Sequence, residues 1–196
     1  MLVGEITWLR PSVPSGIHWI DEPPDRPLPV TARLSRSVGL PAVLPDVIGL
    51  AMRVDAGGRP ADIELASTGL GVPSRFMLLP HRSPSRARFG TLFPYRSRLG
   101  PRLICARPLP RPHPLPAGGA ALDSALAADA WRLRLYHASP TGKWHPFADL
   151  ALRPGADQAD EHLRFDSVRR PLPGADNYAW VRAARQPSYR AVQGPR

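Results

Sequence analysis

Hydrophobic and polar residues alternate over several short stretches of the chain, a pattern typical of β-strands that bury one face and expose the other. In the clearest case, Trp131, Leu133 and Leu135 alternate with arginines and a tyrosine. Other stretches of five to seven residues with strand-like composition lie between glycines and prolines. The expected strands are 30–36, 49–55, 61–66, 75–79, 91–95, 102–107, 131–137 and 147–152.

Turn-forming residues between these stretches set the expected connections. Gly57 and Gly58 predict a β-hairpin from Asp55 to Ala61. Such short strands, joined by glycine- and proline-rich turns, favour a mainly β, antiparallel barrel or sandwich. We treat residues 30–196 as a single domain.

Three segments depart from the strand pattern. Residues 1–29 contain six prolines and are expected to form an irregular, proline-rich N-terminal arm without a long helix, in which short strands or a segment covering a sheet edge can occur. Residues 108–118 carry alternating prolines and predict an extended loop. Residues 120–130 suit a short helix, and a C-terminal helix is expected at about 177–193. Pro187 should kink or split that last helix.

Composition narrows the function classes. The 196 residues include 26 prolines, which disfavours a helical bundle, and one cysteine, which excludes an intramolecular disulfide. No apolar run approaches the roughly 18 residues of a membrane span, so we expect a cytoplasmic protein without a membrane partner. The net charge of +10 suits an anionic partner. The arginines are scattered without a recognition motif, so we do not expect nucleic acid to be that partner.

Motifs for common chemistry do not occur. The six histidines lack metal-ligand spacing, and no G-x-S-x-G sequence marks a serine nucleophile. Cys105 lies in an apolar strand, where a buried, inert thiol is expected. One pair stands out: Arg185 and Tyr189 are four residues apart, so they share one face of the C-terminal helix. A neighbouring guanidinium favours the phenolate, which is a known ligand of haem iron. An ordinary surface helix explains the same spacing.

Two segments resemble the catalase superfamily, in the same order along the chain. The segment nearer the C-terminus is Arg185-Gln186-Pro187-Ser188-Tyr189, followed by Arg196. It is similar to the catalase helix that presents the proximal tyrosine, the ligand of the haem iron. The first comprises Val30-Thr31-Ala32-Arg33-Leu34-Ser35, then Pro45-Asp46-Val47-Ile48-Gly49-Leu50-Ala51-Met52-Arg53-Val54, and then Asp62-Ile63. The whole chain is similar to a compact actinobacterial branch of that superfamily.

The resemblance implies an antiparallel β-barrel with a C-terminal helix that binds haem b. Tyr189 would be the axial ligand of the haem iron, and Arg185 would keep it ionised. Arg33 and Arg196 would hold the haem propionates. A peroxide or other small molecule would be the substrate, and a homo-oligomer is implied.

The chain also departs from the catalase pattern. His18 is the only histidine upstream of Arg33, and its neighbours do not match the distal histidine motif. The distal asparagine position falls at Ala66-Ser67-Thr68. Peroxide cleavage needs a distal acid–base group, so we do not expect efficient catalase activity.

Two functions follow from the resemblance and its departures. The first is a haem-binding protein acting as a weak peroxidase, a specialised haem oxidoreductase or a haem sensor. The alternative is a non-enzymatic barrel that has lost haem and serves as a binding or structural protein. A basic protein that binds a polyanion is a third reading, whose affinity would fall steeply with salt.

Overall fold

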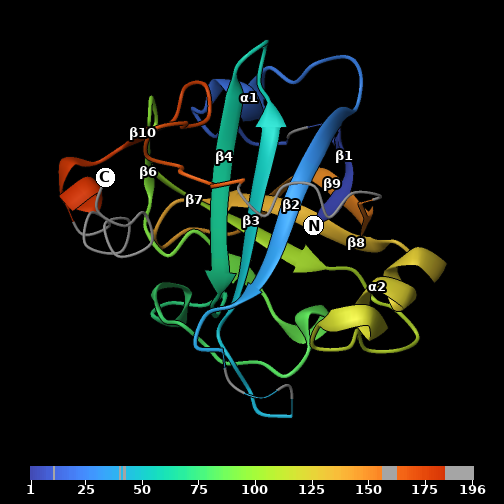
Figure 1. Ribbon diagram of the computed structural model, residues 1–196. Helices are drawn as coiled ribbons and strands as arrows, with labels where there is room; N and C mark the ends of the chain where they lie inside the picture. The colour runs from blue at the N-terminus through green and yellow to red at the C-terminus, as the bar shows by residue number, and fades with distance from the viewer. Residues whose placement is uncertain (11, 40, 42, 156–162, 184–196) are drawn as a thin grey trace, which may run out of the picture.

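In the computed structural model the chain is mainly β and forms an eight-stranded, closed, antiparallel barrel (Figure 1). The structure describes residues 1–10, 12–39, 41, 43–155 and 163–183. Around the barrel the strand order is β7-β5-β4-β3-β2-β1-β9-β8, and a β7–β8 pairing closes the ring. These strands are β1 (Leu2–Trp8), β2 (Leu28–Arg36), β3 (Ile48–Asp55), β4 (Pro60–Ser67), β5 (Phe89–Gly90), β7 (Gly100–Pro108), β8 (Trp131–Ala138) and β9 (His145–Pro154).

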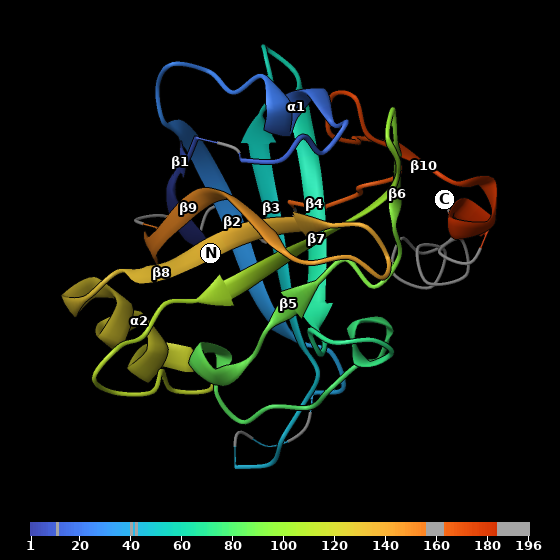
Figure 2. The same ribbon diagram turned by 180° about the vertical axis from the view of Figure 1, so that it is seen from behind.

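Smaller elements lie on the outside of this barrel. Strand β6 (Tyr95–Ser97) pairs with β7 and carries β10 (Asp176–Asn177) on its other side. Figure 2 shows this extension beside the barrel, with helix α2 (Gly119–Ala128) at the opposite side. Short helical segments are α1 (His18–Asp21), η1 (Ser74–Phe76) and η2 (Pro84–Arg86). None of the helices in the described ranges has the length and apolarity needed to cross a bilayer.

The alternating sequence pattern explains the barrel's inner and outer faces. Strands β2, β3 and β4 pair so that Ala32, Met52 and Ile63 lie side by side, and all three are buried. The residues between them along each strand point outward. The expected hairpin is confirmed: Asp55 pairs with Pro60, and Gly57 and Gly58 take positive φ angles in the turn.

Two expected strands, 75–79 and 91–95, differ from the structure. Residues 74–76 form the 3₁₀ turn η1, because the guanidinium of Arg75 turns inward and donates to the carbonyls of Leu70, Ser139, Pro140 and Gly142. Residues 91–94 separate the short strands β5 and β6. Both segments were expected from composition, without a clear alternation of buried and exposed positions.

The N-terminal and C-terminal segments were also predicted from the sequence. Residues 1–29, expected as an irregular arm, contain strand β1, which pairs with both β2 and β9 and is part of the barrel wall. At the other end, residues 179–183 are helical. The remainder of the helix expected at 177–193 lies outside the described residues.

Candidate functional site

Of the four residues expected to hold haem, only Arg33 lies in the described part of the chain. Tyr189, Arg185 and Arg196 lie outside it. Arg33 follows the buried Ala32 in β2, so the alternation of the strand exposes it on the outer surface of the barrel.

The guanidinium of Arg33 packs on an aromatic ring. Its central carbon lies 5.4 Å from the ring centroid of Phe165, and the guanidinium of Arg53 lies at the same distance from that ring. Phe165 is itself buried. Both contacts are within cation–π range. Arg33 thus helps to fix the segment that follows β9 against the outside of the barrel.

A buried carboxylate completes this attachment. Asp62 in β4 is fully buried and accepts two hydrogen bonds from Arg53, at 2.7 and 2.8 Å. It also accepts from the backbone N–H of Asp166 at 2.8 Å, and Arg170 lies 3.6 Å away. Arg53 donates in turn to the carbonyl of Arg164. Because donors surround the Asp62 carboxylate, its role is to clamp residues 164–170 onto β3 and β4 rather than to accept a substrate proton.

The position that matches the distal asparagine of catalases holds the fold together here. Ser67, at the end of β4, is fully buried. Its hydroxyl accepts from the backbone N–H of Ile48 at 3.0 Å and donates to the carbonyl of Leu79 at 2.7 Å. The hydroxyl therefore joins the start of β3 to the segment after η1, and both of these hydrogen bonds are to backbone groups.

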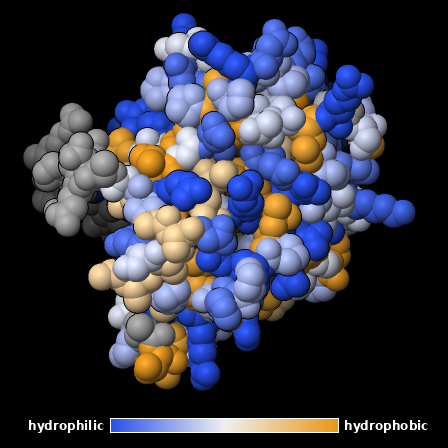
Figure 3. All heavy atoms as spheres, turned by 90° about the vertical axis from the view of Figure 1, so that its right-hand side faces the viewer, coloured by the Kyte–Doolittle hydropathy of each residue, from blue (hydrophilic) through white to orange (hydrophobic). Residues whose placement is uncertain are grey.

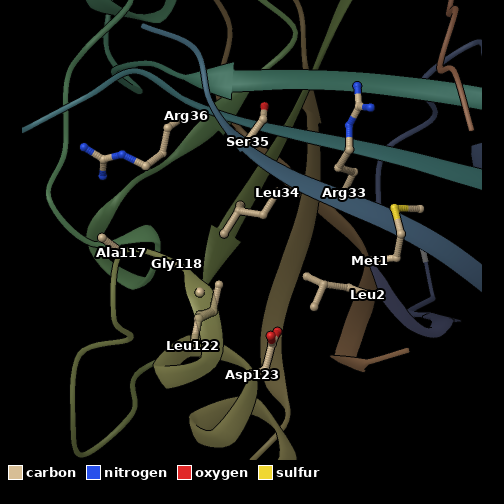
Figure 4. Close-up of a pocket in the computed structure, with 11 residues that line it drawn as sticks. Met1, Leu2, Arg33, Leu34, Ser35, Arg36, Ala117, Gly118, Leu122 and Asp123 are labelled. Carbon is tan, nitrogen blue, oxygen red and sulfur yellow. The ribbon is translucent and has the colours of Figure 1, made fainter. Parts of the chain in front are cut away.

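A cavity of about 340 Å³ lies between β2 and the start of α2 (Figure 4). Leu2, Leu34 and Leu122 form an apolar floor, and the exposed Asp123 is at the rim. Figure 4 shows the Arg33 side chain extending to the side of β2 opposite Leu34 and Leu122. Arg33 is itself among the residues that line the cavity, while its guanidinium packs on the ring of Phe165.

The barrel interior is filled by side chains. Phe89 and Trp131 meet edge to face with ring centroids 5.7 Å apart, and both are buried. Met52 and Phe147 are fully buried in the same core. The interior of an eight-stranded barrel is either filled by side chains or holds one small ligand. In the described part of this barrel the interior is occupied by these side chains, so the residues present do not fit a porphyrin there.

Two histidines that sequence analysis treated as unrelated meet at one end of the barrel. His137 in β8 pairs with His145 in β9, and their ring centroids are 5.6 Å apart. His137 is buried, and its Nε2 lies 3.2 Å from the Val13 carbonyl, so Nε2 carries the proton and donates. The expected strands 131–137 and 147–152 favour a hairpin around the Ser-Pro-Thr-Gly turn, but His145 lay outside the second of them, so its pairing with His137 follows only from the observed register.

Burial controls the protonation of this histidine. It lowers the pKa of His137 to about 4, and the nearby His145 lowers it further. The hydrogen bond to the Val13 carbonyl raises this pKa, and the smaller effects of Arg102 and Asp21 oppose each other. The ring is therefore neutral at pH 7. In the described ranges, no group of three or more His, Cys, Asp or Glu side chains could hold a metal ion.

The single thiol is inert. Cys105 in β7 is buried, as expected from the sequence. Burial raises the pKa of Cys105 to about 12, despite opposing effects of Arg107, Arg75 and Arg88. The reactive thiolate is therefore scarce at neutral pH.

Comparisons with known proteins add no assignment. No protein-family model matches the chain, and no curated protein matches its sequence.

Proposed function

We propose that this chain is a non-enzymatic, haem-free binding protein whose barrel is a solid scaffold. The observation that carries the proposal is the packed interior, in which Phe89, Trp131, Met52 and Phe147 are all buried. Eight-stranded barrels of the lipocalin and streptavidin type hold their ligand in an interior cavity. When side chains fill the interior of a barrel, a binding partner contacts the outer surface.

The chemistry of the described polar groups supports the same proposal. Asp62 and Ser67 are engaged in hydrogen bonds that hold the fold together. His137 is neutral and buried, and the Cys105 thiol is protonated at neutral pH. These residues stabilise the structure and do not combine into a nucleophile with an adjacent base.

Haem-dependent stabilisation tests the proposal. A ligand that binds only the folded state raises the melting temperature as its concentration increases. We expect the melting temperature of the full chain to stay unchanged on addition of haem in stoichiometric amounts and above. A rise with haem concentration that is absent in Tyr189→Phe would contradict the proposal and would favour haem binding through Tyr189, as the resemblance implies.

A further inference from the structure

Most of the exposed large apolar side chains of the described residues belong to two segments at one end of the barrel. Val38, Val43 and Leu44 belong to the loop between β2 and β3, and Phe76, Met77 and Leu78 belong to the segment between β4 and β5. Their exposed fractions run from 39% at Phe76 to 76% at Val43. We call these six residues the loop-end surface. Both segments lie at the lower end of the barrel in Figures 1 and 2.

The two segments of the loop-end surface are joined by hydrogen bonds. Asp46 and His81 exchange backbone hydrogen bonds of 3.0 and 2.8 Å. The Asp46 carboxylate accepts from the backbone N–H groups of Val38 and Gly39, each at 3.0 Å. The apolar side chains are therefore presented by a structured end of the barrel.

Backbone carbonyls in the β2–β3 loop are also satisfied from within. Arg36 donates to the carbonyls of Pro41 and Leu44, at 3.2 and 2.8 Å. Because these carbonyls already accept hydrogen bonds from within the loop, withdrawing water from them costs less free energy than for unpaired carbonyls.

The residues that neighbour the loop-end surface along the chain are mostly basic. Arg82, Arg86 and Arg88 are exposed and lie later in the same segment between β4 and β5. In residues 36–47 and 69–90 the only acidic residue is Asp46, which is buried and hydrogen-bonded. Figure 3 shows apolar surface at the lower end of the molecule, with strongly hydrophilic surface beside it. A partner for this end would therefore be apolar inside and negatively charged at its surface.

We infer that the loop-end surface docks on an anionic phospholipid bilayer. The inference rests on the proposed function, which leaves recognition to the outside of the barrel. Apolar side chains from two loops enter the boundary between headgroups and acyl chains, while arginines contact lipid phosphates. A bilayer fits better than an acidic protein, because the apolar groups project from loops at the barrel's end and do not line a groove. The expectation of no membrane partner came from the lack of a spanning segment, which a surface-docked protein does not need.

Vesicle flotation of the full chain tests this inference. We expect binding to vesicles of phosphatidylcholine mixed with phosphatidylglycerol, and weaker binding to phosphatidylcholine alone. The variant V43E/M77E places two carboxylates on the loop-end surface and should weaken binding about tenfold or more. The matched control is V13E/L99E, which makes the same charge change at exposed apolar residues outside the loop-end surface. It should bind within about twofold of the unaltered chain.

Three results would overturn the inference. The first is no binding of the unaltered chain to anionic vesicles. The second is equal loss in V43E/M77E and V13E/L99E, which would show adsorption through net charge only. The third is concentration-dependent self-association that V43E/M77E abolishes, which would assign the surface to a second copy of the chain. None of these results depends on haem, so the melting experiment decides the proposed function separately.

Discussion

At the scale of residues, two arginine–aspartate pairs share a cross-strand geometry but differ in burial. Arg53 pairs with Asp62 between β3 and β4, and Arg134 pairs with Asp149 between β8 and β9. Asp62 is fully buried, whereas the side chains of the second pair are each 36% exposed. Breaking a buried pair leaves an uncompensated charge, while an exposed pair contributes little.

We therefore expect Asp62→Asn to lower the free energy of unfolding by about 3 kcal/mol. Asp149→Asn, the matched control, should lower it by less than about 1 kcal/mol. Urea unfolding of the two variants measures the difference. Equal losses would show that Asp62 does not clamp residues 164–170 onto the barrel.

His137 makes stability depend on pH. Its pKa is about 4 in the folded state and about 6.5 in an unfolded chain. Between these values the unfolded state binds more protons, so stability rises with pH through this window and is lost as pH falls from about 6.5 towards 4. The loss should reach about 2 to 3 kcal/mol.

Urea unfolding at pH 7.5 and pH 5 measures this dependence. The variant His137→Gln keeps a side-chain donor for the Val13 carbonyl but does not titrate, so its stability should change less between the two pH values. If the unaltered chain and His137→Gln lose the same stability, the assignment of the pH dependence to His137 is wrong.

At the scale of elements, β1 shows why the expected N-terminal arm differs from the structure. Prolines correctly indicated that residues 9–29 lack a long helix, but β1 precedes all of them. Its short pattern has only Leu2 and Ile6 buried, with a glycine between them. An added side chain at Gly4 would collide with the carbonyl of Ala151, so the close approach of β1 and β9 requires glycine there. Sequence alternation alone does not reveal that constraint.

Ile6 and Val3 test whether β1 is a wall of the barrel. Ile6 is fully buried and Val3 is 43% exposed on the same strand. We expect Ile6→Ala to cost about 3 kcal/mol of unfolding free energy. Val3→Ala should cost less than about 0.5 kcal/mol. A detachable arm would give two small losses in thermal or urea unfolding, which would contradict the observed pairing.

Among the remaining segments, those whose apolar and polar residues alternate clearly could be predicted as strands, and those without such alternation could not. The strands around Met52, Ile63 and Leu133 were predictable because their inward positions repeat every second residue. Residues 75–79 have no such repeat, and the contacts of Arg75 with distant carbonyls decide their conformation. Tertiary hydrogen bonds of this kind have no local sequence signal.

At the scale of the whole molecule, the sequence predicted the mainly β class better than it predicted the site. The inward-facing residues could be identified, but their meeting across the barrel depends on strand number and tilt. The contact of Arg33 with Phe165 joins residues far apart in the sequence, in a strand and in the segment after β9, and no local pattern predicts it. Haem binding through Tyr189 stays a prediction, because that residue lies outside the described ranges.

An absorbance titration of the purified full chain with haem distinguishes a solid, haem-free barrel from a haem protein. We expect a spectrum equal to the sum of free haem and protein, with no saturable Soret band, for both the unaltered chain and Tyr189→Phe. A Soret band that saturates at one haem per chain and is lost or shifted in Tyr189→Phe would contradict it.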